Sequence, residues 1–239
     1  MSQSIQHSFI VYFASLSSQL AHLTSVSPYR LQSELGDGHY WIKEPGLKIE
    51  FPLRIIGDEK DPSHATIELG GTIVLNGGNI WMEGVSLRRP RIASGEMKSQ
   101  EILHIKNGGR FDMLNCMLDN DGCRGSVARL SGSSAQGRWD QVEICGAERQ
   151  NCALSLEGGA SVELHKCRIW KNHGDGVLCS DKSSVKMHGC VVKANDGIGV
   201  CLKDESRCEA LNSNFFSNKK GNNRVDKTSS MMYNEEGAE

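Results

Sequence analysis

The chain has 239 residues, 38% of them hydrophobic, and a formal net charge of −2 at pH 7. This near balance of charge argues against bulk electrostatic attraction to nucleic acid or to an anionic membrane surface. No run of about 18 apolar residues is present, so the sequence predicts no membrane span.

Residues 1–33 form the first predicted segment, an N-terminal cap or leader. Residues 8–16 are an apolar run of signal-peptide length, but no Lys or Arg precedes it and no small-x-small cleavage site follows. We therefore expect a helix to about His22 that covers the open end of the first coil. The alternative is secretion, with residues 1–25 acting as a signal peptide.

The next segment, residues 46–101, is predicted to form less regular entry coils followed by a basic loop. That loop, residues 88–98, contains a cluster of cationic side chains, Arg88, Arg89, Arg91 and Lys98. Clustered Arg side chains recognise phosphate or carboxylate through paired hydrogen bonds, which makes this loop a candidate binding element. The alternative interpretation is a solvated charged loop.

From residue 103 onward the sequence repeats every 23 to 26 residues. Within a repeat, apolar residues alternate, skip one position and alternate again, as in Val162, Leu164, Cys167 and Ile169. Alternation indicates a strand, and the extra residue indicates a sharp bend. The bend column contains Asn115, Gln141, Lys166, Gly189 and Asn212, and Gly and Asn tolerate a left-handed backbone best.

Four further columns of equivalent apolar positions follow the same steps. Their members are Met113, Trp139, Leu164, Met187 and Ala210; Leu118, Ile144, Ile169, Val192 and Phe215; Leu103, Ala128, Leu154, Val177 and Val200; and Ile105, Leu130, Leu156, Cys179 and Leu202. Self-similarity at a fixed period is the signature of a solenoid. The prediction is an all-β, single-stranded parallel β-helix over residues 34–218, with a disordered polar tail at 219–239.

Two segments connect this pattern to a known family. Residues 172–177 (NHGDGV) and 195–200 (NDGIGV) resemble the Asn-x-Gly-x-Gly-Val signature of right-handed parallel β-helix repeats. The resemblance covers roughly residues 45–218, and it implies right-handed coils. Within the superfamily, residues 38–41 and 51–57 are similar to the entry coil of the β-helix regions of SHC SH2-domain-binding proteins and of β-helix-type F-box proteins. That likeness implies an intracellular, non-enzymatic role.

Two outward columns carry charge. Asp112, Arg138, Glu163, Lys186 and Glu209 alternate in sign, which is typical of a ladder that stabilises the stacking of coils. In the adjacent column, Asp140, His165 and His188 fall on consecutive coils and could hold a divalent metal or form an acid/base relay. Solvated surface residues explain that second column equally well.

Aromatic and amide columns complete the candidate sites. Trp170, Lys193 and Phe216 share an outward column that could stack a planar ligand or a sugar. Asn172, Asn195 and Asn218 are interpreted as a structural ladder of stacked amides. No residue pattern indicates a cofactor.

The nine cysteines fall largely in apolar columns, where a free thiol behaves as a small hydrophobe. Buried thiols are favoured over a disulfide between Cys167 and Cys190, which predicts a reducing, cytoplasmic compartment. The function expected from these observations is a non-catalytic protein-interaction scaffold with an unidentified protein partner. One alternative is a polyuronate lyase or hydrolase, but the carboxylate pairs and catalytic motifs that such an enzyme needs are scarce in this sequence. The other alternative is a carbohydrate-binding protein without catalysis.

Overall fold

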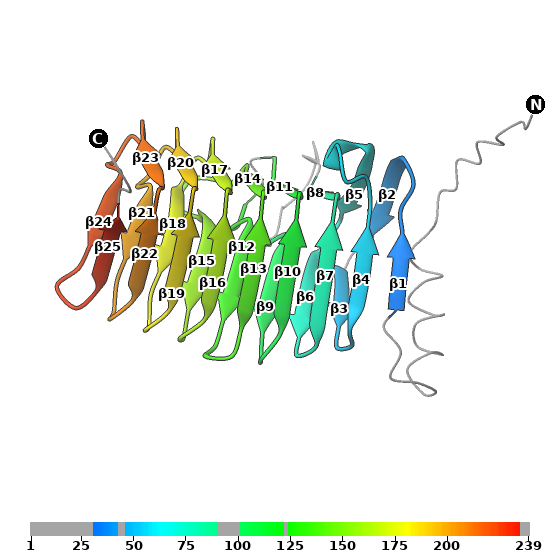
Figure 1. The fold of residues 1–239 in the computed structure, drawn as a ribbon, viewed down its shortest axis with the longest axis horizontal. Coiled ribbons are helices and arrows are strands. Elements are labelled where there is room, and N and C mark those ends of the chain that lie inside the picture. Colours follow the sequence, from blue (N-terminus) through cyan, green and yellow to red (C-terminus); the bar gives the residue numbers. More distant parts are fainter. Residues whose placement is uncertain (1–30, 43–45, 90–100, 122–123, 235–239) are drawn as a thin grey trace, which may run out of the picture.

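A computed structural model of the chain describes residues 31–42, 46–89, 101–121 and 124–234. In these residues the chain winds through three parallel sheets, and each coil contributes one strand to each sheet (Figure 1). One short 3₁₀ helix, η1 (Pro62–His64), interrupts the described coils. The result is a parallel β-solenoid, as the repeat predicts.

The three sheets are named A, B and C. Within the described residues, sheet A consists of β1 (Leu31–Glu34), β4 (Leu53–Ile56), β7 (Asn79–Glu83), β10 (Arg110–Leu114), β13 (Gln136–Asp140), β16 (Ser161–His165), β19 (Ser184–His188), β22 (Arg207–Leu211) and β25 (Ser230–Asn234). Sheet B consists of β2 (Gly38–Ile42), β5 (Ala65–Leu69), β8 (Ser86–Arg88), β11 (Met117–Asp119), β14 (Glu143–Cys145), β17 (Arg168–Trp170), β20 (Val191–Lys193) and β23 (Asn214–Phe216). Sheet C consists of β3 (Gly46–Ile49), β6 (Thr72–Asn76), β9 (Leu103–Lys106), β12 (Ala128–Ser131), β15 (Cys152–Glu157), β18 (Asp175–Cys179), β21 (Val200–Leu202) and β24 (Asn223–Val225).

The strand register confirms the predicted columns. Met113 pairs with Trp139, which pairs with Leu164, and the column continues through Met187 to Ala210. The apolar columns of sheets B and C are in register in the same way. The alternating charges of the outward column on sheet A also lie on paired residues, and Lys186 Nζ is 3.9 Å from Glu209 Oε2.

The corner between sheets A and B is made by the predicted bend column. All five of its residues have a positive φ, between 47° and 63°. At Gly189 this conformation has no steric cost, whereas Asn and the longer side chains adopt it less readily. The bend therefore rests on backbone hydrogen bonds between coils, such as Lys166 N–H to His188 O at 2.8 Å.

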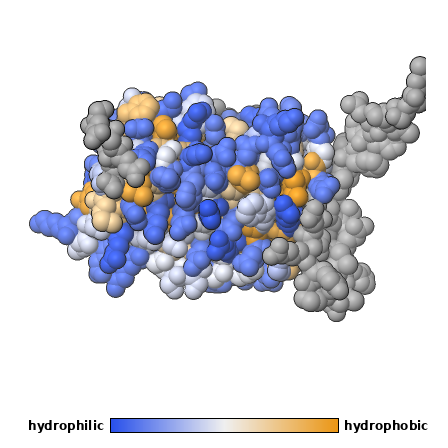
Figure 2. Space-filling view, in the orientation of Figure 1, coloured by the Kyte–Doolittle hydropathy of each residue, from blue (hydrophilic) through white to orange (hydrophobic). Residues whose placement is uncertain are grey.

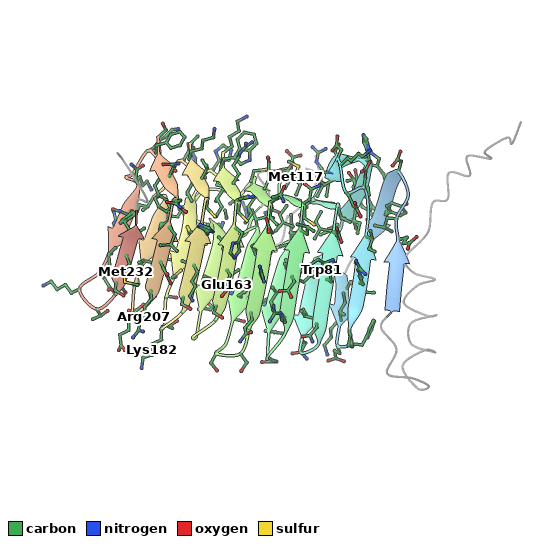
Figure 3. All side chains as sticks on the ribbon, viewed as in Figure 1. Trp81, Met117, Glu163, Lys182, Arg207 and Met232 are labelled. Atoms are coloured by element: carbon green, nitrogen blue, oxygen red, sulfur yellow. The ribbon has the colours of Figure 1, made fainter. Side chains whose placement is uncertain are left out.

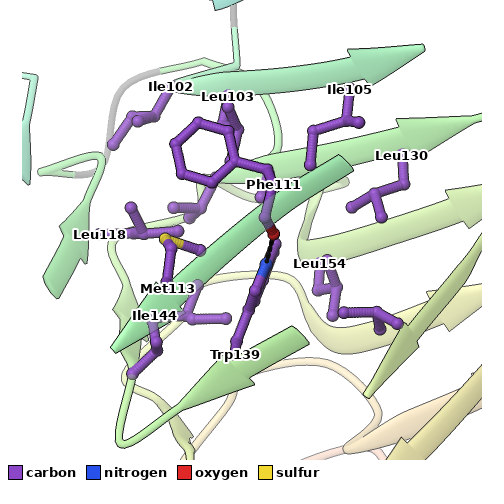
Figure 4. Close-up of a cluster of buried hydrophobic side chains, with 14 of the residues drawn as sticks. Ile102, Leu103, Ile105, Phe111, Met113, Leu118, Leu130, Trp139, Ile144 and Leu154 are labelled. Atoms are coloured by element: carbon purple, nitrogen blue, oxygen red, sulfur yellow. Dashed lines mark hydrogen bonds between the residues drawn. The ribbon is translucent and has the colours of Figure 1, made fainter. Parts of the chain in front are cut away.

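The interior of the solenoid is filled with apolar side chains. Phe111 and Trp139 are the largest fully buried residues, and both are 0% exposed (Figure 4). The indole Nε1–H of Trp139 donates to the Phe111 carbonyl at 2.9 Å, so the polar edge of the ring is satisfied inside the core. None of the described residues forms an apolar helix long enough to cross a membrane.

The glycines of the repeat signature are explained by close backbone packing between coils. A Cβ atom on Gly174 would lie 1.6 Å from the Asn151 carbonyl oxygen, and one on Gly176 would lie 2.5 Å from the Gly199 oxygen. These positions lack room for any side chain, whatever their backbone dihedral angles.

Buried asparagines stack at the turns that follow β17, β20 and β23 of sheet B. The Asn172 Nδ2–H donates to Asn195 Oδ1 at 2.9 Å, and the Asn195 Nδ2–H donates to Asn218 Oδ1 at 2.9 Å. The same oxygens accept from the Asn172 and Asn195 backbone N–H groups at 3.2 and 3.1 Å. The predicted amide ladder is therefore confirmed. It satisfies backbone groups that the turns would otherwise leave buried without partners.

Replacing Asn195 with alanine is expected to lower the free energy of unfolding by about 2 kcal/mol. The change leaves buried donors and acceptors on the neighbouring coils without partners. Urea denaturation measures the effect. Asn151→Ala is the matched control, because its side chain makes a single long hydrogen bond to Arg149 O at 3.4 Å. Equal stability of the two variants would show that the ladder contributes nothing to folding.

The predicted boundaries of the N-terminal cap and of the C-terminal tail are wrong. The N-terminal cap was expected to extend to residue 33, but residues 31–33 belong to β1, which pairs with β4. The helix expected before them lies outside the described residues. The tail expected to be disordered from residue 219 instead adds β24 and β25 to sheets C and A.

Residues 219–234 are ordered by hydrogen bonds that cannot be inferred from their polar composition. The Asp226 carboxylate accepts from the Thr228 and Ser229 backbone N–H groups at 3.0 and 2.8 Å, and from Asp204 N–H in the preceding coil at 2.7 Å. These contacts, those from Ser229 foremost, hold the pKa of Asp226 far below its usual range. A polar coil can therefore stack on the solenoid because its backbone is paired.

Candidate functional site

One outward row of side chains runs along sheet B and joins two separately predicted binding elements. In strand order the row contains Trp41, Glu68, Arg88, Asp119, Cys145, Trp170, Lys193 and Phe216. Arg88 of the basic loop thus lies on the same face as the aromatic column of Trp170, Lys193 and Phe216. We call these eight residues the sheet B row.

Cations cover the aromatic rings of this row. Lys171 Nζ lies 4.4 Å from the Trp170 ring centroid, and Lys193 Nζ lies 5.7 Å from the Phe216 centroid. The Trp170 Nε1–H donates to Glu143 Oε2 at 3.2 Å, which fixes the ring on the sheet surface. The predicted register of Trp170, Lys193 and Phe216 is confirmed. Because Lys171 and Lys193 lie over the rings, stacking of a sugar would require these cations to move aside.

A groove of about 730 Å³ opens between the middle of the sheet B row and the turns that follow those strands. Met117 of β11 lies on this side of the solenoid, at the top of Figure 3. The lining residues that carry its chemistry are Asp119, Glu148, Arg149, Trp170, His173 and Asp196. We call this feature the sheet B groove.

Several acidic groups of the groove are already paired with cations. Arg88 lies 3.7 Å from carboxylate oxygens of both Asp119 and Asp121. Asp196 lies 2.7 Å from Lys219 Nζ and 3.2 Å from His173 Nδ1. Lys219, followed by His173, lowers the pKa of Asp196. The Asp196 carboxylate is therefore favoured in its ionised form and is not held as a neutral general acid.

The thiol in the groove is not a nucleophile at neutral pH. Burial, with a smaller contribution from the Asp119 carboxylate, raises the pKa of Cys145 to about 12. The thiolate is the reactive form of cysteine, so a thiol held protonated is unsuited to covalent catalysis. The groove thus offers an aromatic wall and fixed charges of both signs, which suit recognition better than bond cleavage.

Four residues in and beside the sheet B groove repeat with the period of the coils. A search for single motifs does not detect this repeat. Glu148, His173, Asp196 and Lys219 are spaced by 25, 23 and 23 residues, the period of the coils. Each therefore follows an equivalent strand, and carboxylate side chains alternate with basic side chains from coil to coil. The turn positions belong to no apolar column, so this row was not identified from the sequence.

The predicted metal column is in register, but its side chains do not converge. Asp140, His165 and His188 occupy paired positions on β13, β16 and β19. The imidazole rings of His165 and His188 meet edge to face, with 5.9 Å between their centroids. Among the described residues, the set of possible ligand atoms that all lie within 4.8 Å of one another belongs instead to Asp37, Asp58 and His64.

That second cluster joins Asp37, between β1 and β2, to Asp58 and His64, which both lie in the connection between β4 and β5. His64 Nδ1 lies 2.8 Å from Asp58 Oδ2, and this contact, more than any other, raises the pKa of His64. The carboxylate of Asp58 also accepts from Lys60 N–H at 2.7 Å. Two carboxylates and an imidazole could ligate a divalent cation, although Asp58 and His64 already pair with each other. The repeat period does not indicate this group, because Asp37 lies in a different connection from Asp58 and His64.

The basic loop divides into parts with different roles. Arg88 ends β8 and faces solvent in the sheet B row. The prediction that Arg89 binds a ligand is wrong: this side chain is 7% exposed, and its Nη2 donates to the Gly71 and Glu101 carbonyls, each at 2.9 Å. The buried Arg89 side chain thus connects the chain at Gly71 to the chain at Glu101. Arg91 and Lys98 lie outside the described residues.

The comparison with protein-family models agrees with this architecture. A family model described as "Right handed beta helix region" matches residues 71–235. Among solved structures, the periplasmic alginate epimerase AlgG is similar at 11% sequence identity and a TM-score of 0.28, and the match covers 87% of this chain and 78% of that chain. A search of curated proteins finds no match.

Proposed function

The chain belongs to the right-handed β-helix family, and from this premise we propose that it is a non-catalytic interaction module that binds a protein partner through the sheet B groove. The observation that carries the proposal is the combination of Trp170 with fixed charges of both signs in one groove. Trp is enriched among the residues that dominate protein–protein binding, and charges at the rim select the partner.

The pairing of charges inside the groove supports recognition of a protein segment. Asp119, Asp121 and Asp196 are neutralised by cations of the chain itself, so they shape the groove without making it strongly acidic. Glu148 and Arg149 offer charges of opposite sign at adjacent positions of the lining. A peptide carrying both signs of charge and an apolar side chain would match these groups.

The state of the cysteines supports a reducing, cytoplasmic location for this interaction. All eight cysteines among the described residues are buried and free. Burial raises the pKa of most of these thiols, to about 12 for Cys116 and Cys208. Buried protonated thiols are typical of proteins that persist where disulfides are rare. The resemblance to non-enzymatic β-helix domains points in the same direction.

Replacing Trp170 with alanine is expected to weaken partner binding by about 30-fold, the effect of losing one dominant aromatic contact. Affinity capture followed by quantitative mass spectrometry identifies proteins that depend on this residue, and calorimetry with the purified partner measures the affinity.

The chain provides a matched control in Trp81, which lies on the face of sheet A (Figure 3). Trp81 is exposed whereas Trp170 is half-buried, and the Nε1–H of Trp81 donates to Glu83 Oε2 at 3.2 Å, as that of Trp170 does to Glu143. Trp81→Ala should therefore retain the partner. Retention of every captured protein by Trp170→Ala would exclude the groove as the docking site.

A second candidate is binding of an acidic polysaccharide, favoured by the cations over the aromatic rings. Arg168, Lys171 and Lys193 lie beside Trp170 and Phe216 on one face. Cations placed at intervals along a solenoid could follow the carboxylates of an extended chain. Titration with uronate oligosaccharides tests this directly: saturable binding lost in Lys193→Ala, without a protein partner, would replace the first proposal with this one.

A further inference from the structure

The Asn-Gly dipeptide occurs twice in the chain, at residues 76–77 and 107–108, and each copy lies in a turn from sheet C to sheet A. Both copies are followed by a second glycine, so their local sequences match. Turns of this kind lie at the bottom of Figure 3, where Lys182 is labelled, whereas Met117 of the sheet B groove lies at the top. Figure 2 shows hydrophilic and near-neutral surface along this lower side.

An asparagine that precedes a glycine can lose its side-chain amide to attack by its own backbone. The backbone nitrogen of the glycine bonds to Cγ of the asparagine, the Cγ–Nδ2 bond breaks, and ammonia leaves with the hydrogen from that nitrogen. Water then opens the cyclic imide at either carbonyl group, which yields aspartate or isoaspartate. Glycine favours the attack because it has no Cβ to obstruct ring closure. The reaction consumes only water, and its rate depends on how freely the nitrogen and Cγ can meet.

The two copies differ in the contacts of the attacking nitrogen. The Gly77 N–H donates to the Lys106 carbonyl of the next coil at 3.2 Å. Within the described residues, the Gly108 N–H has no hydrogen-bond partner. Gly108 is also exposed, whereas Gly77 is half-buried. Because ring closure removes the hydrogen from this nitrogen, the bond to Lys106 must break before Gly77 can react, and Gly108 meets no such barrier.

The two side-chain amides are also restrained to different degrees. The Asn76 Nδ2–H donates to Glu50 Oε1 at 3.1 Å, and Asn76 Oδ1 accepts from the Asn107 Nδ2–H at 2.6 Å. Asn76 is therefore held from both sides, by the coil before and by the coil after. The exposed Asn107 side chain makes the second of these bonds alone within the described part of the chain. Turning Cγ toward the backbone thus costs fewer hydrogen bonds at Asn107 than at Asn76.

We propose that Asn107 deamidates in the folded protein, whereas its hydrogen bonds protect Asn76. The product has a carboxylate in place of the Nδ2–H donor, so the side chain at position 107 and Asn76 Oδ1 are both acceptors. Rotating the Asn76 amide restores that contact but turns its oxygen toward Glu50. The chain of hydrogen bonds that joins three successive coils of sheet C therefore loses one link in either orientation.

Peptide mapping by mass spectrometry tests the proposal on the full chain incubated at mildly alkaline pH. Deamidation at Asn107 should be about tenfold faster than at Asn76, the ratio that corresponds to two fewer hydrogen bonds. In the urea-unfolded chain the two rates should become similar, because both sites have the sequence Asn-Gly-Gly. Equal rates in the folded chain, faster loss at Asn76 or no loss at Asn107 would overturn the proposal. A tenfold difference that persists in urea would also overturn it, because the fold would not be its cause.

Asn107→Asp reproduces one of the two products and tests the effect on the coils. This variant should unfold at a lower urea concentration than Asn79→Asp, which adds the same charge at the start of β7. The Asn79 side chain is exposed and makes no hydrogen bond within the described residues, so its replacement removes none. Equal urea midpoints for the two variants would overturn the loss of a link between coils.

Discussion

Replacing Val177 with aspartate is expected to prevent the chain from folding at room temperature. Val177 is 0% exposed and stands in the middle of an inward column of sheet C, between Leu154 and Val200. An aspartate there buries a carboxylate among apolar side chains with no cation in the column. The expected loss of stability is about 5 kcal/mol or more, which equals the whole stability of many domains. Circular dichroism and urea denaturation measure it.

The adjacent residue supplies the control for this prediction. Leu178 lies on the same strand, β18, but its side chain points outward between Ser155 and Cys201. Leu178 is half-buried, so Leu178→Asp leaves its charge in partial contact with water and should cost much less, about 1 to 2 kcal/mol. If both variants unfold at the same urea concentration, the assignment of inward and outward faces on sheet C is incorrect.

The register of the coils could be predicted because the constraint repeats. Every coil must place apolar residues at the same inward positions, so errors at one coil are corrected by the next. The placement of Trp139 illustrates this, since its column contains Met113 and Leu164 on either side. The five bend residues were identified by the same means, although Gln141 and Lys166 are poor left-handed residues taken singly.

Features that depend on a single contact could not be predicted. Arg89 looks like its neighbour Arg88 in the sequence, yet its side chain is buried and its guanidinium donates to two carbonyl groups. Asp226 looks like one more charge in a polar tail, yet it holds a turn closed. Composition describes the average environment of a segment, and these residues are exceptions to that average.

The sheet B groove could be predicted from the sequence only in part. Its walls follow the coil period, so Trp170 could be placed on the outer face of sheet B from sequence. Its depth depends on the turns after β14 and β17, whose lengths differ from coil to coil. Glu148 and His173 occupy equivalent coil positions, yet their contribution to one concave surface appears only when the turns are seen in space.

Replacing Gly174 with alanine is expected to lower the free energy of unfolding by about 4 kcal/mol, more than ordinary overpacking does. The added Cβ would lie 1.6 Å from the Asn151 carbonyl oxygen and 2.7 Å from its carbonyl carbon. The obstructing atoms are backbone, so no side-chain rotation relieves the overlap. The same Asn151 oxygen accepts the Asp175 N–H at 3.1 Å, and moving the two segments apart would break that bond between coils.

Gly36→Ala separates this steric effect from the general cost of changing a glycine. A Cβ on Gly36 meets nothing within 4 Å, so the substitution should leave stability unchanged or raise it by about 0.5 kcal/mol through lower entropy of the unfolded chain. Urea midpoints of the two variants give the comparison. Because Gly174 follows His173 in the lining turn, its substitution should also abolish partner binding, whereas Gly36→Ala should retain it. Equal midpoints would mean that the coils can separate locally at little cost, and the rigid groove inferred for partner binding would then be untenable.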